Sequence, residues 1–289
     1  MHDYLLSILL GIVEGVTEFL PVSSTAHLRI AEKLLDLHLD DPFWKMYSIV
    51  IQLGAILAVP LYFWERIYKF LRTFPRGERG DRTALTHPLS LTLLAFFITA
   101  LPSFLLTKLI GKNLESLTVI AIALLVGGVV MWVVDALCKR PYVMHMEEMS
   151  PMTAAWIGAV QILSAVFPGT SRSMCTIAAG QIAGMSREAA LEFSFFLSIP
   201  TMIVATGFTL LKTVLPHHHA DAAAAANLVP MKPLGAHEWA VLLIGFVISF
   251  IVALAVIAWF MRWVRRRGFV PFAIYRILLG ISLLVMLLS

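Results

Sequence analysis

Charged residues and cysteines are both scarce in this chain of 289 residues. Asp, Glu, Lys and Arg together make up 14% of the sequence, against about 25% in ordinary soluble domains. So few charges exclude a soluble globule and a disordered chain. The two cysteines, Cys138 and Cys175, lie inside apolar runs, which excludes a disulfide-rich secreted protein. The net charge of +4 does not indicate nucleic-acid binding, because the basic residues fall in short loops between apolar stretches.

Apolar residues, in contrast, make up 59% of the chain. A membrane-spanning helix needs about 20 mostly apolar residues. Such stretches occur at about residues 46–64, 89–109, 118–138, 190–211, 239–261 and 271–288. The sequence therefore predicts an all-α polytopic membrane protein, with residues 1–289 forming a single integral membrane domain that contains about six transmembrane helices.

Two further apolar stretches, residues 4–35 and 154–185, are interrupted near their middles by TEFLPVSSTAH and SAVFPGTSRSM. Each interruption contains proline and leaves two arms of about 13–15 residues. About 13 residues of α-helix rise only about 20 Å, so such arms reach the middle of a bilayer and turn back. Non-helical backbone is tolerated at that depth only where protein or water surrounds it. Both stretches are therefore predicted to form re-entrant helical hairpins.

The two interruptions also resemble each other. GIVEGVTEFLPVSST, which begins at Gly11, aligns without gaps on GAVQILSAVFPGTSR, which begins at Gly158, and this alignment places Ser24 on Ser171. Paired broken segments in the two halves of a membrane protein are the best sequence indication of a binding site at the bilayer midplane.

Topology follows from counting the spans. Because three spanning helices separate the hairpins, the second hairpin enters from the opposite face, which predicts an inverted-topology repeat of residues 4–138 and 154–288. Basic residues concentrate in the loop 65–88, at 139–140 and at 262–267, and the face richer in Lys and Arg is expected to be cytoplasmic. Both termini and the mouth of the first hairpin would then face outward.

Ionisable groups in the first hairpin are candidates for function, because such groups are rare at membrane depth. Glu14 and Glu18 lie four residues apart, on one face of a helix. Two carboxylates so close resist ionising together unless a divalent cation, a proton or a basic partner relieves their repulsion. Oxygen ligands suit Mg²⁺ or Ca²⁺. The hairpin also holds His27 and four hydroxyl side chains, those of Thr17, Ser23, Ser24 and Thr25.

The second hairpin has the opposite chemistry, carried by PGTSRS. It combines a flexible Gly169, the hydroxyls of Thr170, Ser171 and Ser173, and Arg172 at the start of a helix. Backbone amides at a helix N-terminus favour an anion, and an arginine recognises phosphate oxygens in a bidentate manner. If the two tips meet, a carboxylate–metal site faces a phosphate cradle, as metal-assisted phosphoryl transfer requires. In a membrane, the substrate would be a lipid phosphate.

Simpler explanations exist for single residues. Hydroxyl side chains in membrane helices commonly bond backbone, and an isolated intramembrane glutamate can be an ion or proton relay in a carrier. His217, His218 and His219 could bind a metal, but the Ala-rich segment after them indicates a solvated linker.

EGVTEFLPVSSTAH and PGTSRS together resemble the undecaprenyl-diphosphate phosphatases of the bacitracin-resistance type, and the resemblance extends through SREAALEFSFFLSIP and FVPFAIYR. It implies a bacterial inner-membrane enzyme that removes one phosphate from undecaprenyl diphosphate. This activity recycles the lipid carrier for cell-wall synthesis and confers bacitracin resistance. A divalent-metal requirement, two re-entrant hairpins and a homodimer are also implied. A lipid-phosphate carrier or flippase and a catalytically silent homologue are the alternatives.

The resemblance also implies roles for individual residues. Glu14 and Glu18 fall on a glutamate-rich motif, Ser24 on a proposed nucleophile and His27 on an essential histidine. Ser171, Arg172 and Thr176 fall on the phosphate-binding motif and a hydroxyl just beyond it. Either His27 or Glu18 could serve as base for Ser24 or for a water. The active site is expected to open to the periplasmic side.

Two positions depart from the family pattern. Ala26 stands where glycine is usual, and Met174–Cys175 replace a usual pair of small residues. Both changes are expected to enlarge side chains near the phosphate pocket.

Overall fold

The structure is a computed structural model, and it describes residues 2–35, 37, 41–78, 80–106, 116–214 and 234–288. Within these ranges the regular secondary structure is entirely helical. Its helices are α1 (His2–Thr17), α2 (Ser24–Leu34), α3 (Pro42–Tyr62), α4 (Trp64–Thr73), α5 (Pro88–Leu105), α7 (Leu117–Leu137), α8 (Pro151–Val166), α9 (Arg172–Ile182), α10 (Arg187–Val214), α12 (Ala236–Arg267), α13 (Val270–Leu288) and the 3-10 turn η1 (Met146–Glu148). His217, His218 and His219 lie outside the described residues.

Six helices in these ranges, α3, α5, α7, α10, α12 and α13, are long and apolar enough to cross a membrane. They coincide with the six stretches predicted from hydropathy, with ends shifted by a few residues. The expected all-α polytopic membrane fold is therefore confirmed.

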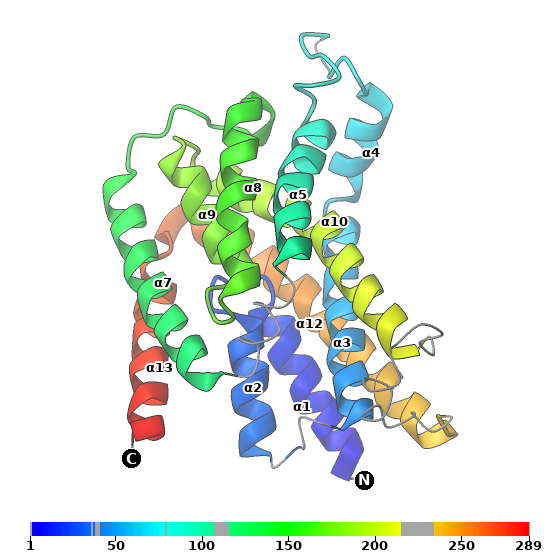
Figure 1. Cartoon of the computed structure of the whole chain (residues 1–289). Helices are drawn as coiled ribbons and strands as arrows, with labels where there is room; N and C mark the ends of the chain where they lie inside the picture. The colour runs from blue at the N-terminus through cyan, green and yellow to red at the C-terminus, as the bar shows by residue number, and fades with distance from the viewer. Residues whose placement is uncertain are drawn as a thin grey trace.

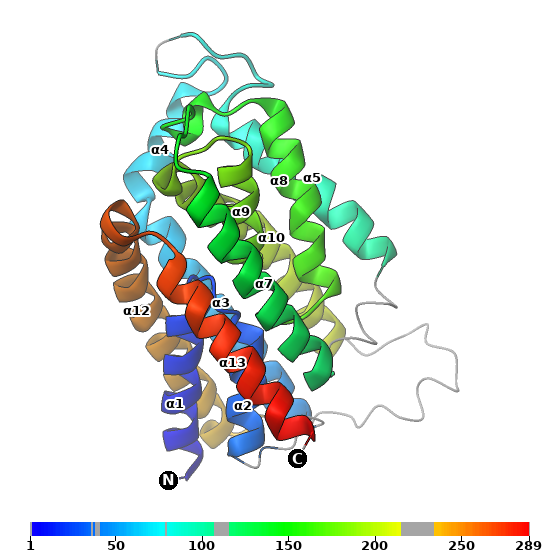
Figure 2. The ribbon, with the colours of Figure 1, turned by 90° about the vertical axis from the view of Figure 1, so that its left-hand side faces the viewer.

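The two interrupted stretches form helical hairpins that enter the bundle from opposite ends (Figure 1). α1 and α2 have 16 and 11 residues, and α8 and α9 have the same two lengths. The longer arms rise about 24 Å, which is less than the roughly 30 Å of a bilayer core. Both chain termini lie at the end of the bundle opposite α4 (Figure 2). The tips meet inside the bundle, where the Ser173 hydroxyl donates to the Leu20 carbonyl at 3.0 Å.

Each hairpin turns at a serine in an unusual backbone conformation. Ser23 (φ 74°) and Ser171 (φ 73°) are the only non-glycine residues with positive φ in the described ranges. Each serine caps the helix that follows: Ser23 Oγ accepts from the backbone N–H of Ala26, and Ser171 Oγ from that of Met174. The chain advances 12 residues from Gly11 to Ser23 but 13 from Gly158 to Ser171, so the gap-free alignment is off by one residue at the tips. Ser23 pairs with Ser171, and Ser24 pairs with Arg172.

Glycines allow the first arm of each hairpin to pack closely on a spanning helix. A Cβ at Gly11 in α1 would lie 3.0 Å from the Gly245 carbonyl of α12, and one at Gly158 in α8 would lie 2.5 Å from the Ala95 carbonyl of α5. Small residues at such contacts let helix backbones approach in a membrane, where packing drives association. The first arm of each hairpin is thereby held close against one spanning helix, α1 against α12 and α8 against α5.

Ion pairs tie together the end of the bundle that carries α4. Arg66 of α4 binds Glu147 of η1 at 2.8 Å and Glu192 of α10 at 2.6 Å. Arg187 at the start of α10 binds Asp135 of α7 at 2.6 Å. These pairs hold the start of α10 in place, and the next residues of that helix face the hairpin tips.

Candidate active site

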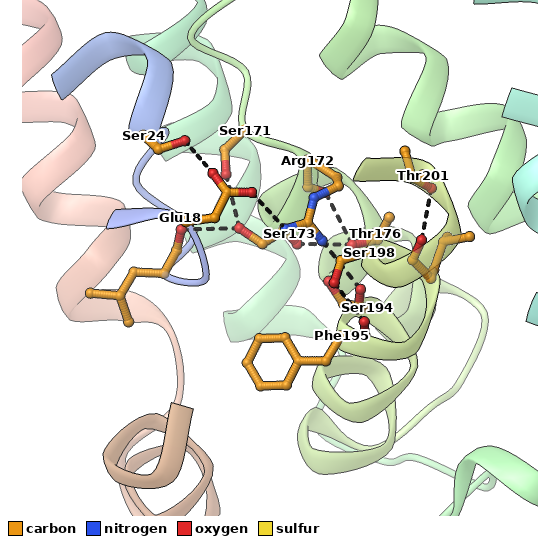
Figure 3. A network of polar contacts seen from close by, with 12 residues as sticks. Glu18, Ser24, Ser171, Arg172, Ser173, Thr176, Ser194, Phe195, Ser198 and Thr201 are labelled. Atoms are coloured by element: carbon orange, nitrogen blue, oxygen red, sulfur yellow. Dashed lines mark hydrogen bonds and ion pairs between the residues drawn. The ribbon is translucent and has the colours of Figure 1, made fainter. Parts of the chain in front are cut away.

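Glu18 lies at the centre of the polar contacts between the two tips (Figure 3). It directly follows the last residue of α1, and its side chain is only 5% exposed. One carboxylate oxygen accepts from Ser24 Oγ at 2.6 Å, and the other accepts from Arg172 Nη2 at 3.2 Å. A buried carboxylate can be stabilised by a divalent cation, by a proton or by a basic partner. In this structure Arg172 is the basic partner of Glu18.

Arg172 reaches Glu18 from the second hairpin, where it is the first residue of α9. Its Nη1 donates to the Ser194 carbonyl of α10 at 3.3 Å, and its guanidinium lies 5.9 Å from the ring centre of Phe19. The side chain is only 11% exposed. Partial burial strengthens the interaction of this cation with an anion, because the local dielectric is low.

A cavity of about 660 Å³ lies beside this pair, and side chains from both tips line it. The predicted residues that it brings together are Glu18, Ser23, Ser24, Thr25, Gly169, Ser171 and Arg172. The cavity is therefore a cleft that presents a carboxylate, an arginine and several hydroxyls to one ligand.

The remaining predicted phosphate-binding hydroxyls do not line this cleft. The Ser173 hydroxyl lies 3.0 Å from Ser171 Oγ and bonds the first tip. Thr176 donates to Ser194 Oγ at 2.7 Å, joining α9 to α10. Thr170 donates to the Phe167 carbonyl within its own turn. Ser173, Thr176 and Thr170 thus hold the tip in shape, because hydroxyls in an apolar interior bond nearby backbone and side chains.

Glu14 is fully buried one turn before Glu18, and it does not line the cleft. Neither of its carboxylate oxygens has a hydrogen-bond partner among the described residues. Its charged neighbours are Glu18, Glu32 and Arg172. Two free carboxylate oxygens beside a second carboxylate fit a hard divalent cation. Within the described ranges, however, no group of three or more His, Cys, Asp or Glu side chains is placed to hold a metal ion.

His27 is not brought to Ser24. Its Nδ1 lies 2.7 Å from the Ser23 carbonyl, its Nε2 lies 2.6 Å from the Tyr275 hydroxyl of α13, and the two rings stack at 5.6 Å. His27 lines a second cavity of about 570 Å³, which shares no lining residue with the cleft. The expected use of His27 as a base for Ser24 is therefore not supported. Both ring nitrogens are engaged elsewhere, and they hold the turn at Ser23.

Arg276 of α13 is a central residue to which the sequence interpretation assigned no role. It is fully buried and donates to the Pro21 carbonyl of the first tip and to the Gly169 and Thr170 carbonyls of the second, at 2.9–3.1 Å. A side chain at Gly127 of α7 would collide with its guanidinium. One arginine thus holds both tips. Its position in an apolar helix was a visible signal, because buried ionisable groups in membranes mark functional regions.

The two departures from the family pattern lie outside the cleft. Ala26 is fully buried against Ile120 and Leu124, while Met174 and Cys175 belong to the main apolar core. None of the three lines the cleft. These side chains therefore do not narrow the cleft directly, because α2 and α9 turn them toward the core, although the backbone N–H groups of Ala26 and Met174 bond the tip serines beside the cleft.

Comparison with known proteins identifies the family. Residues 7–282 match the family described as bacitracin resistance protein BacA. The chain belongs to the BacA family. The chain is 62% identical to an undecaprenyl-diphosphatase of Koribacter versatilis, over 98% of both proteins. It is 41% identical to an undecaprenyl-diphosphatase of Caldanaerobacter subterraneus, over 96% of this chain and 94% of that protein. It is 40% identical to one of Rhizobium etli, over 99% and 98% of the two chains.

Proposed function

We propose that this protein hydrolyses undecaprenyl diphosphate to undecaprenyl phosphate and inorganic phosphate in the bacterial inner membrane. The family and the undecaprenyl-diphosphatases that resemble it over nearly their full length support this activity. The observation that carries the proposal is the contact of Glu18 with both Ser24 and Arg172 inside the cleft. A nucleophile, a base and a phosphate-binding cation then lie within one hydrogen-bond network. The product returns to cell-wall synthesis, which confers resistance to bacitracin.

Ser24 is the nucleophile and Glu18 its base in this mechanism. Ser24 Oγ attacks the terminal phosphorus, and its proton passes to Glu18, whose oxygen is 2.6 Å away. The bond from the terminal phosphorus to the bridging oxygen breaks, and undecaprenyl phosphate leaves with that oxygen. Water then attacks the phosphoserine, the bond to Ser24 Oγ breaks, and Glu18 returns the proton to that oxygen.

Arg172 binds the terminal phosphate and stabilises the charge that develops there. It exchanges Glu18 for a phosphate oxygen when substrate enters, while its bond to the Ser194 carbonyl keeps the guanidinium in place. Donors fixed in advance stabilise a transition state without reorganising, and removing one typically lowers kcat by about 10²–10³.

Glu14 and Glu18 would hold the divalent cation, Mg²⁺ or Ca²⁺. The unpartnered, buried oxygens of Glu14 support this assignment. When bound, the cation supplies positive charge that neutralises the diphosphate. We propose that the cleft opens to the periplasmic side. The basic segments 65–88 and 262–267 indicate that the face on which they lie is cytoplasmic, and the cleft opens to the other face.

The decisive measurement is phosphate release from farnesyl or undecaprenyl diphosphate by purified protein in detergent, with Mg²⁺ and then with EDTA. We expect release by the wild type, a loss of at least about 100-fold in Arg172→Ala, and no loss in Arg265→Ala. The control removes an arginine that pairs with Glu188 outside the cleft. Protein that is folded and binds lipid but releases no phosphate would favour the carrier or the silent homologue.

Ser24→Ala separates the two possible nucleophiles. A phosphoserine mechanism requires this variant to be essentially inactive, and a phosphorylated Ser24 should be trapped by rapid acid quench of the wild type. Substantial turnover by folded Ser24→Ala would instead show that water attacks phosphorus directly, with Glu18 as its base.

A further inference from the structure

The cleft changes in character along its length. Its inner part is formed by the charged and hydroxyl residues of the tips, and neutral polar side chains such as Gln161 and Thr201 follow. The outer part comes from two spanning helices and is mostly apolar, with Phe96, Ala100 and Phe104 on α5 and Met202, Val204 and Phe208 on α10; Thr99 and Ser103 of α5 also line it. The order of polarity thus matches a ligand with a phosphate head and a hydrocarbon chain.

The apolar part reaches the side of the bundle. Phe104 is 68% exposed and Phe208 is 43% exposed, whereas Glu18 and Arg172 at the inner end are nearly buried. Because α5 and α10 are membrane-spanning helices, such a side surface lies against lipid. A chain that lies between α5 and α10 therefore passes from the phosphate site directly into hydrocarbon, without crossing water.

Local helix chemistry favours an opening between these two helices. Pro102 lies inside α5 and Pro200 inside α10. A proline within a helix removes one backbone hydrogen bond and bends the helix. Beyond these prolines, at the outer end of the cleft, the ring of Phe104 on α5 packs edge to face on the ring of Phe208 on α10, with centroids 6.5 Å apart. Two aromatic rings at this distance can separate by rotamer changes and close again.

The size of the cavity limits what it can enclose. About 660 Å³ lies in the range of pockets for small ligands, so the cleft holds the diphosphate and the first isoprene units only. The remaining chain must lie outside. The second cavity, beside His27, offers no route for it, because that cavity shares no lining residue with the cleft.

We propose that the prenyl chain of the substrate enters and leaves the cleft sideways between α5 and α10, past the facing rings of Phe104 and Phe208. This inference rests on the proposed function, and it assigns these two phenylalanines as the gate for the chain.

The test cross-links the gate reversibly. In Phe104→Cys/Phe208→Cys, a short bifunctional methanethiosulfonate joins α5 to α10, and dithiothreitol releases it. We expect cross-linking to lower phosphate release from farnesyl diphosphate at least tenfold, and reduction to restore it. The wild type treated identically controls for Cys138 and Cys175, the native thiols. Full activity in the cross-linked protein would overturn the gate, whereas inactivity of the untreated wild type would count against the proposed function itself.

A second variant set does not depend on cross-linking. Phe104→Trp and Phe208→Trp narrow the opening and are expected to raise KM for farnesyl diphosphate severalfold, with a smaller change in kcat. The control is Ile12→Trp, which introduces an even larger increase in side-chain volume beside the second cavity and should leave KM unchanged. A KM increase in Ile12→Trp alone would place the chain in the second cavity and overturn the proposal. Thermal unfolding of each variant shows that it is folded.

Discussion

The two serines at the hairpin tips permit a prediction in which stability and activity change separately. Ser171 has φ 73° and ψ 120°, a conformation that residues with a Cβ rarely adopt. Non-glycine residues in sparsely populated backbone regions cost of order 1–3 kcal/mol, and they persist where the surrounding structure fixes them. Around Ser171, bonds from Ser173 to the first tip and from Arg276 to Gly169 and Thr170 fix the turn.

Replacing Ser171 by glycine should raise the free energy of unfolding, whereas replacing it by alanine should lower it. Glycine relieves about 1–3 kcal/mol of strain. Glycine also lowers the stability by about 0.5–1 kcal/mol, because it raises the conformational entropy of the unfolded chain. The lost helix cap costs a few tenths of a kcal/mol more. The net expectation is a stabilisation of about 1 kcal/mol. Alanine keeps the strain and loses the cap, which costs about 0.5–2 kcal/mol. Ser171→Gly should thus exceed Ser171→Ala in stability by about 2 kcal/mol.

Thermal unfolding in one detergent at one scan rate measures this order. A difference of about 2 kcal/mol corresponds to several degrees in Tm. Both variants lack the hydroxyl that lines the cleft, so phosphate release should fall in both by a similar factor of about 10–100, the value of a hydrogen bond to a charged group. Equal Tm values for the two variants, or a less stable glycine variant, would refute the argument that the tip is strained.

Four further predictions concern single side chains. Glu18→Gln removes the proposed base and the carboxylate that binds Arg172, so kcat should fall by about 10²–10⁴ in phosphate-release assays. His27→Gln should lower Tm and kcat but leave the shape of the pH–rate profile unchanged; a shifted profile would show that His27 transfers a proton. Arg276→Lys keeps the charge but loses the fork that binds both tips, so Tm should fall by several degrees and kcat should fall with it. Hydrogen bonds, chiefly from the backbone N–H of His145, hold the pKa of Glu148 below its ordinary value of 4.5. The ionised Glu148 therefore stabilises the connection between α7 and α8 at pH values above 4.5, and this stabilisation is lost as the pH falls through the lowered pKa. Proteolysis of this connection should thus increase at acid pH in the wild type and not in Glu148→Gln.

Most of the fold could be predicted because hydropathy and proline act locally. Apolar runs of about 20 residues marked the six spans, and the breaks at Pro21 and Pro168 marked the hairpins. The helix ends were less well predicted, because a cap fixes them and not hydropathy. α3 begins at Pro42, since the Asp41 side chain accepts from the backbone N–H of Phe43 at 2.7 Å, several residues before the apolar run.

The site was predictable where a side chain is costly in lipid. Glu18 and Arg172 stood out for this reason, and the structure joins them. Which face of a short helix points to a neighbour could not be predicted from the sequence, because tertiary packing decides it. His27 was therefore expected beside Ser24, whereas the structure turns its ring to Tyr275. No sequence signal distinguishes a hydroxyl that lines a cleft from one that bonds its own helix.

The likeness of the two hairpins explains how one carboxylate comes to bind two different partners. Both tips turn at a serine with nearly the same φ, and both place their next residue at the start of a short helix. In one hairpin this residue is Ser24, and in the other it is Arg172. Because the hairpins enter from opposite ends, the two equivalent positions face each other across Glu18 and reach its two oxygens. The two hairpins are thus nearly alike, and the proposed chemistry depends on the pair of equivalent positions at which the proposed nucleophile, Ser24, stands opposite the cation of Arg172.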